Sequence, residues 1–162
     1  MNVSILVVGA GNLGRRHLQS LKLSDNIAKI YVVDSSDTAI SLTKEAIEQA
    51  KIKIPVCYFK SLDEIQKFNI DIAIVATTAN SRLPILKSII DYGIRNIVLE
   101  KIVFNSIQDI DDGLFLISKE ESTKIWVNCP RRLYPIYNKL KMEIKGSVFK
   151  SFTVKGNNFG MG

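Results

Sequence analysis

The stretch that decides the fold is Gly9-Ala10-Gly11-Asn12-Leu13-Gly14, which follows the apolar run Val3-Ser4-Ile5-Leu6-Val7-Val8 and precedes a segment of helical periodicity. A strand, a glycine-rich turn and a helix in this order are typical of a dinucleotide-binding site. Gly9 turns the chain sharply, Gly11 lets the backbone approach a pyrophosphate, and Gly14 lets the helix pack closely on the strand. Free N–H groups and the positive end of the helix dipole then favour the phosphates.

Asp34 ends the second apolar run, Ile30-Tyr31-Val32-Val33, 20 residues past Gly14. A carboxylate there accepts hydrogen bonds from the adenosine ribose hydroxyls. A glycine pattern alone is weak evidence, but the strand, helix and acid together favour a functional site over a structural turn. A carboxylate about 4 Å from a 2′-phosphate is repelled by roughly 4 kcal/mol at an effective dielectric near 20. Since Ser35 and Ser36 add no cation, we predict NAD rather than NADP.

The bulk composition fits one globular domain, or one domain and part of another, because 46% of the 162 residues are hydrophobic. The formal net charge of +6 comes from scattered lysines and arginines, and only Arg15-Arg16 and Arg131-Arg132 are adjacent. No basic stripe with interleaved aromatic residues is present in the sequence, so we expect no nucleic-acid partner.

Cys57 and Cys129 belong to no CxxC or Cys/His cluster, so the sequence predicts neither a metal site nor a disulfide framework. No apolar run approaches membrane-spanning length, and the first strand begins without a charged leader segment. We expect a cytoplasmic protein with no membrane partner.

Short apolar runs alternate with segments of helical periodicity, which indicates βαβ units and a doubly wound parallel sheet of the α/β class. The expected strands are 3–8, 29–33, 56–59, 71–76, 96–99 and 124–128. The apolar stripes of the expected helices are Leu13, Leu18, Leu21; Ala39, Leu42, Ala46, Ala50; Leu83, Leu86, Ile90; and Ile107, Ile110, Leu114, Ile117. Ser61-Leu62-Asp63-Glu64 and Ser106-Ile107-Gln108-Asp109 resemble capping boxes, Pro84 fits an early helical turn, and Gly93 fits a helix end.

The pattern changes near residue 125. Another helical stripe covers residues 133–144, and residues 149–155 alternate apolar and polar side chains as an antiparallel strand does. We therefore predict a dinucleotide-binding Rossmann domain at 1–124, and at 125–162 a linker helix and the first strand of an incomplete C-terminal α/β domain.

Several motifs together resemble the glucose-fructose oxidoreductase, inositol dehydrogenase and MocA (Gfo/Idh/MocA) family. They are Gly9 to His17, Ala76-Thr77-Thr78, Val98-Leu99-Glu100-Lys101, and Arg132 with Pro135. The resemblance implies a Rossmann domain joined to a C-terminal α/β domain, with Lys101 facing the reacting carbon and the substrate hydroxyl. The chain has Ile102 where the family has a proline, and Arg82 where the family commonly has a histidine.

Position alone leaves two interpretations of Lys101, a ligand-facing residue at the carboxyl end of a parallel strand or a surface lysine beside Glu100. The resemblance favours catalysis, in which the amine supports a developing alkoxide. Thr77, Thr78 and Asn80 can contact the nicotinamide half of the cofactor or cap a helix. The predicted cofactor-binding residues are Gly9, Gly11, Asn12, Leu13, Gly14, Asp34, Thr77, Thr78, Asn80, Glu100 and Lys101, and the predicted catalytic residue is Lys101.

These observations predict an NAD-dependent oxidoreductase acting on a hydroxyl or carbonyl of a sugar or cyclitol derivative. The alternatives are a non-catalytic NAD-binding or sensing module and, with less support, an S-adenosylmethionine enzyme. His17 is the only histidine, and we expect it to have a structural role because it lies about one turn into the helix after the glycines, where a polar ring packs near the cofactor loop or caps a local hydrogen bond. The resemblance implies that the proton-transfer histidine lies in the second domain. The resemblance implies that this chain alone is inactive and that the full-length protein is a homo-oligomer with a small sugar-like substrate.

Overall fold

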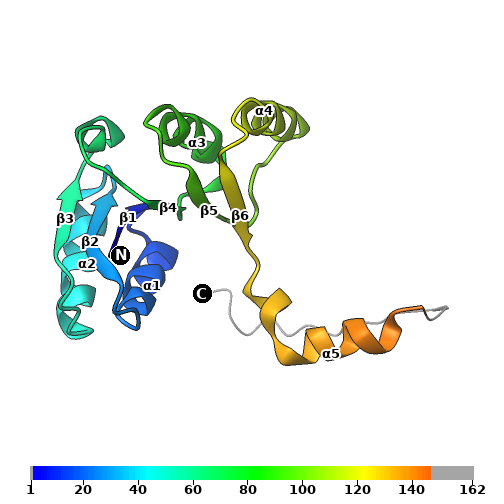
Figure 1. Cartoon of the computed structure of the whole chain (residues 1–162). Coiled ribbons are helices and arrows are strands. Elements are labelled where there is room, and N and C mark those ends of the chain that lie inside the picture. Colours follow the sequence, from blue (N-terminus) through cyan, green and yellow to red (C-terminus); the bar gives the residue numbers. More distant parts are fainter. Residues whose placement is uncertain (1, 147–162) are drawn as a thin grey trace. The chain divides into compact units, whose positions relative to one another are not determined.

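A six-stranded, all-parallel sheet forms the centre of the computed structural model, which describes residues 2–146. The strands are β1 (Val3–Val8), β2 (Ile27–Val33), β3 (Val56–Phe59), β4 (Ile72–Val75), β5 (Asn96–Glu100) and β6 (Lys124–Asn128). Their order is β3-β2-β1-β4-β5-β6 (Figure 1), which is the doubly wound Rossmann arrangement expected from the sequence. The order reverses between β1 and β4, so the crevice at their carboxyl ends is the expected ligand position.

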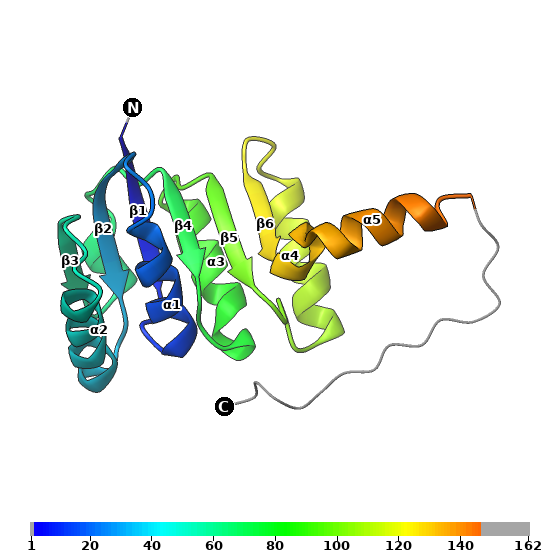
Figure 2. The same ribbon diagram turned by 90° about the horizontal axis from the view of Figure 1, so that it is seen from below.

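Helices cover both faces of the sheet (Figures 1 and 2). On one face, α1 (Asn12–Leu21) and α2 (Asp37–Gln49) contribute Leu18 and Ile47 to a buried cluster that contains Ile5 and Val7 of β1. On the other face, α3 (Arg82–Asp91) packs against the alternate β1 residues, including Leu6. The continuous apolar strands of the sequence are explained by this burial on both faces.

Serine caps start three of the helical segments, and two of these caps, at Ser61 and Ser106, were predicted from the sequence. The Ser36 hydroxyl accepts from the Ala39 N–H, and the Ser106 hydroxyl accepts from the Asp109 N–H at the start of α4 (Ile107–Ser118). Ser61 and Glu64 form a reciprocal capping box, but the segment that they start is the short 3₁₀ helix η1 (Leu62–Ile65).

The apolar stripe predicted for α4 differs from the observed packing. Ile107, Ile110 and Leu114 are exposed, whereas Gly113 is buried beside the Phe104 ring. A Cβ at Gly113 would lie 2.6 Å from a ring carbon of Phe104, so close packing at the glycine sets the face that α4 turns to the core. Helical periodicity therefore gave the helix correctly and its buried side wrongly.

The chain divides into two compact units after Asn128. Since β6 pairs with β5 along its whole length, the sheet extends beyond the expected domain boundary at residue 124. The second unit contains η3 (Pro130–Leu133) and α5 (Pro135–Ile144), which covers most of the predicted 133–144 helix. The strand predicted at 149–155 lies outside the described residues. None of the helices in residues 2–146 combines the length and apolar character needed to cross a lipid bilayer.

Candidate functional site

At two glycines of the segment after β1, Gly9 and Gly14, the surrounding backbone leaves no space for a side chain. Gly9 has a φ of +95°, which strains any L side chain, and a Cβ there would lie 2.9 Å from the Ala76 carbonyl carbon. A Cβ at Gly14 would lie 1.9 Å from the Gly9 carbonyl oxygen. Gly9 thus allows the glycine-rich loop to approach the end of β4, and Gly14 allows the first turn of α1 to pack against that loop.

Gly11 has a different role because a Cβ at this position would meet nothing within 4 Å. It is the N-cap of α1, so the first N–H groups of this ten-residue helix lie next to it. Arg15 fixes the same turn, since its guanidinium donates to the Ala10 carbonyl at 3.0 Å and to the Asn12 side chain at 2.5 Å. Open space beside bare backbone at a helix N-terminus fits a diphosphate group.

Two clefts meet at this turn, and both are lined by Gly11, Ala76, Thr77 and Thr78. We call the first, of about 590 Å³, the Asp34 cleft, because Asp34 and Ser35 line its other side. The second, of about 520 Å³, is the Lys101 cleft. Its further lining residues include Asn12, Leu13, Asn80, Arg82, Lys101 and Ile102.

Asp34 holds the end of β2 to the glycine turn. Its Oδ2 accepts from the Ala10 N–H at 2.7 Å and its Oδ1 accepts from the Ser36 N–H at 2.8 Å. A carboxylate has about four acceptor positions, so Asp34 keeps capacity for ribose hydroxyls. Lys60, which follows β3, also lines this cleft and donates to the Ser35 carbonyl at 3.1 Å. The sequence interpretation missed this cation, because Lys60 is far from Asp34 along the chain.

Lys101 is exposed and lines its cleft from the end of β5. Thr77, Thr78 and Asn80 line the same cleft from the end of β4 and from the 3₁₀ helix η2 (Ala79–Ser81). The Asn80 side chain also accepts a hydrogen bond from the Asn105 amide. The structure thus brings the residues predicted around Lys101 together, while their contacts with a cofactor remain predictions.

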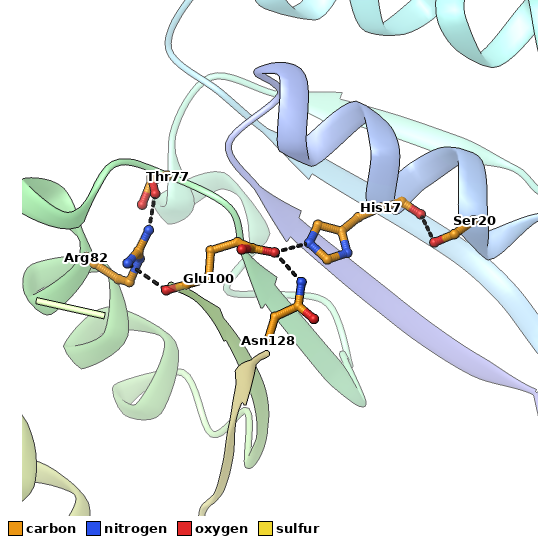
Figure 3. A network of polar contacts seen from close by, with 6 residues as sticks. All are labelled: His17, Ser20, Thr77, Arg82, Glu100 and Asn128. Carbon is orange, nitrogen blue, oxygen red and sulfur yellow. Dashed lines mark hydrogen bonds and ion pairs between the residues drawn. The ribbon is translucent and has the colours of Figure 1, made fainter. Parts of the chain in front are cut away.

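Glu100 lines neither cleft and is buried, with 3% of its surface exposed. Figure 3 shows its side chain directed toward His17 and Asn128. Its Oε1 lies 2.7 Å from the His17 Nε2 and accepts from the Asn128 amide at 2.5 Å. The carboxyl thereby joins α1 to the ends of β5 and β6. His17 contacts a buried carboxyl, a partner that could not be read from the sequence. Its structural role stays a prediction.

Arg82 is also buried, with 2% of its surface exposed. Its Nη1 donates to the carbonyls of Glu100 at 2.7 Å and Val103 at 3.0 Å, and also to the Ile102 carbonyl. Its Nη2 donates to the Thr77 carbonyl (Figure 3). Burial lowers the pKa of the guanidinium, and the nearby Glu100 acts in the opposite direction. The peptide bond between Lys101 and Ile102 is cis.

Comparison with known families gives a match over residues 3–129, to the model described as "Oxidoreductase family, NAD-binding Rossmann fold". A search of curated proteins found no match.

Solved structures share the fold at low identity. Myo-inositol 2-dehydrogenase from Lactobacillus plantarum has a TM-score of 0.76 at 15% identity, covering 90% of this chain and 41% of that chain. Scyllo-inositol dehydrogenase from Lactobacillus casei with bound NAD(H) and scyllo-inositol has a TM-score of 0.75 at 17% identity, covering 90% and 41%. The WlbA dehydrogenase from Chromobacterium violaceum, in complex with NADH and UDP-GlcNAcA, has a TM-score of 0.74 at 20% identity, covering 89% and 40%. The chain therefore spans about 41% of the length of the first two structures.

Proposed function

The chain belongs to the Gfo/Idh/MocA oxidoreductase family with its NAD-binding Rossmann fold, and we propose that the complete protein moves hydride between NAD and a hydroxyl or carbonyl of a sugar or cyclitol derivative. One observation carries the proposal. Gly11, Thr77 and Thr78 line both clefts, so the Asp34 cleft and the Lys101 cleft are continuous around the glycine turn. A dinucleotide bound across the turn would have the Asp34 carboxylate beside its adenosine ribose at one end and the Lys101 amine at the other end.

The glycine turn supports binding of the diphosphate. Gly11 leaves space beside the first N–H groups of α1, and these groups can donate to the phosphate oxygens. Asp34 can accept from ribose hydroxyls with the acceptor capacity left by its two backbone hydrogen bonds. Asp34 disfavours a 2′-phosphate by charge, so we propose NAD over NADP, with Lys60 as a partly opposing charge.

Bound NAD supplies the nicotinamide ring that accepts or returns a hydride. The chain's contribution at that end is the Lys101 amine, which is exposed within its cleft. It donates a hydrogen bond to the substrate oxygen and stabilises the negative charge that develops there. Thr77 and Thr78 line the same cleft as Gly11 and Lys101.

A sugar-like substrate is proposed from the neighbours, since two of them were crystallised with scyllo-inositol or UDP-GlcNAcA. The chain covers about 41% of those with inositol names. We therefore propose that residues outside this chain complete the substrate pocket and supply the proton-transfer group, and that residues 1–162 alone bind NAD but turn over poorly.

Replacing the lysine amine tests the catalytic proposal. In the complete protein, assayed by reduced-nicotinamide absorbance against a panel of sugars and cyclitols, Lys101→Ala is expected to lower kcat by about 10²-fold or more. The dissociation constant for NAD should change less than about threefold, because the amine acts on the substrate oxygen. Lys87→Ala, an exposed lysine of α3, is the matched control. Unchanged turnover in Lys101→Ala contradicts the role, and tight NAD binding without turnover on any substrate favours a sensing module.

A further inference from the structure

A buried arginine holds the backbone around the proposed catalytic lysine. Arg82 is the first residue of α3, and its guanidinium reaches two separate segments, one after β4 and one that runs from the last residue of β5 into the following loop. Figure 3 shows the Arg82 side chain between Thr77 and Glu100. With 2% of the Arg82 surface exposed, its Nη1 and Nη2 groups have exchanged water for these carbonyl contacts, whereas its Nε is buried without a hydrogen-bond partner.

The acceptors lie on both sides of Lys101. Nη1 donates to the carbonyl of Glu100, which precedes Lys101, and to the carbonyls of Ile102 and Val103, which follow it. The Nη2 contact with the Thr77 carbonyl joins this segment to the wall that both clefts share. A guanidinium is planar and its donors point in fixed directions, so it limits how the two segments can lie relative to each other; the two N–H groups of Nη1 are shared among the three carbonyls of the Lys101 segment.

Packing alone does not account for an arginine here. A buried positive charge is costly, and an apolar side chain of similar length would fill the volume without that cost. The hydrogen bonds to carbonyls offset the cost and confine two loops that have no regular secondary structure to fix them. The buried charge is therefore explained by the hydrogen bonds through which the guanidinium holds these two loops.

We propose that Arg82 is a positioning residue that fixes the backbone on both sides of Lys101 and so aims the Lys101 amine along the Lys101 cleft. The inference rests on the proposed function for the role of the amine. The placement of the loop can be measured without any substrate. The positioning role of Arg82 and the proposed function can therefore be refuted independently of each other.

The test compares Arg82→Met and Arg82→Lys with the wild-type chain. Arg95→Met is the matched control, because the Arg95 guanidinium also donates to a backbone carbonyl, that of Ile90 at 2.7 Å, but next to the opposite end of β5. Hydrogen exchange is followed by mass spectrometry in peptides covering residues 100–105 and, as a reference for global stability, residues 3–8. The rate at which acetic anhydride acetylates Lys101, with and without saturating NAD, reports the position of the amine.

In both Arg82 variants, exchange at 100–105 is expected to rise by about tenfold or more, as for the loss of one charged hydrogen bond. Exchange at 3–8 should stay near the wild-type rate. NAD should still bind by calorimetry, but the protection that it gives Lys101 in the wild type should be lost. Arg95→Met should leave all three readouts unchanged.

Unchanged exchange at 100–105, or unchanged protection of Lys101 with NAD bound, overturns the positioning role. An equal rise at 100–105 and 3–8 in both Arg82 variants also overturns it, because Arg82 would then contribute to global stability only. Absence of NAD binding in the wild type contradicts the proposed function, while the exchange comparison still decides what Arg82 does to the loop.

Discussion

Two glycines of the same turn should respond to alanine in opposite ways. At Gly14 a Cβ would lie 1.9 Å from the Gly9 carbonyl oxygen and 2.9 Å from its carbon. Both are backbone atoms, so α1 must move away from the turn to restore ordinary contact of 3.4 Å or more. At Gly11, with φ −68° and nothing within 4 Å, the added carbon meets only the open space of the two clefts.

The magnitudes separate folding from binding. Gly14→Ala should lower the unfolding free energy by about 1–3 kcal/mol, as for overpacking, and hence Tm by roughly 2–12 °C. Gly11→Ala should change the unfolding free energy by less than about 1 kcal/mol, because an N-cap alanine loses only some solvation of the helix end. Its methyl group occupies the proposed place of the diphosphate, so the dissociation constant for NAD should rise by about tenfold or more.

Thermal unfolding and calorimetric titration with NAD on both variants measure these effects. The reasoning is refuted if Gly11→Ala binds NAD like the wild type, because the diphosphate would then lie elsewhere. It is also refuted if Gly14→Ala keeps the wild-type Tm, because the close approach of α1 to the turn would then not exist.

Three further outcomes are expected. Asp34→Ser should raise the NADP-to-NAD affinity ratio by about tenfold or more, since the repelling carboxylate is gone and Lys60 remains in the cleft. Adding Lys60→Met to this variant should reverse most of the gain. An unchanged affinity ratio in Asp34→Ser would disprove the charge argument. His17→Ala should lower the unfolding free energy by about 1–3 kcal/mol, because the buried Glu100 carboxyl loses a partner at 2.7 Å. Urea unfolding measures this change. Additive effects of His17→Ala and Glu100→Gln in the double mutant would show that the two side chains do not interact. Gly113→Ala should lower Tm by several degrees, because the new Cβ lies 2.6 Å from a buried aromatic ring, and a Tm at or above that of the wild type would contradict the packing described for α4.

The sheet could be predicted from the sequence because its strands are buried on both faces. Each of the six expected strands is found. Three have the expected bounds, and the ends of the other three differ by one or two residues, as in β2, which begins at Ile27 rather than at residue 29. Continuous apolar runs do not depend on knowing the partner strand. The family assignment from the glycine turn and the Glu100-Lys101 pair is confirmed by the family match over residues 3–129.

The side-chain network was less accessible, because its members are far apart in the chain. The contact between His17 and Glu100 spans 83 positions, and no local pattern indicates it. Arg82 could be recognised as a departure from the family, but its carbonyl partners depend on two loops that approach only in the folded sheet. The exposure of the apolar stripe on α4 was also missed. Helical periodicity shows which residues share one face of a helix, but it does not show whether another part of the fold covers that face.

Titration of NAD into the folded protein by calorimetry tests the central claim that the glycine turn and the α1 N-terminus hold the dinucleotide. The account predicts saturable heat with one site per chain, abolished or strongly weakened in Gly11→Ala. Absence of both heat and saturation with NAD and NADH, in protein shown to be folded by circular dichroism, would contradict it.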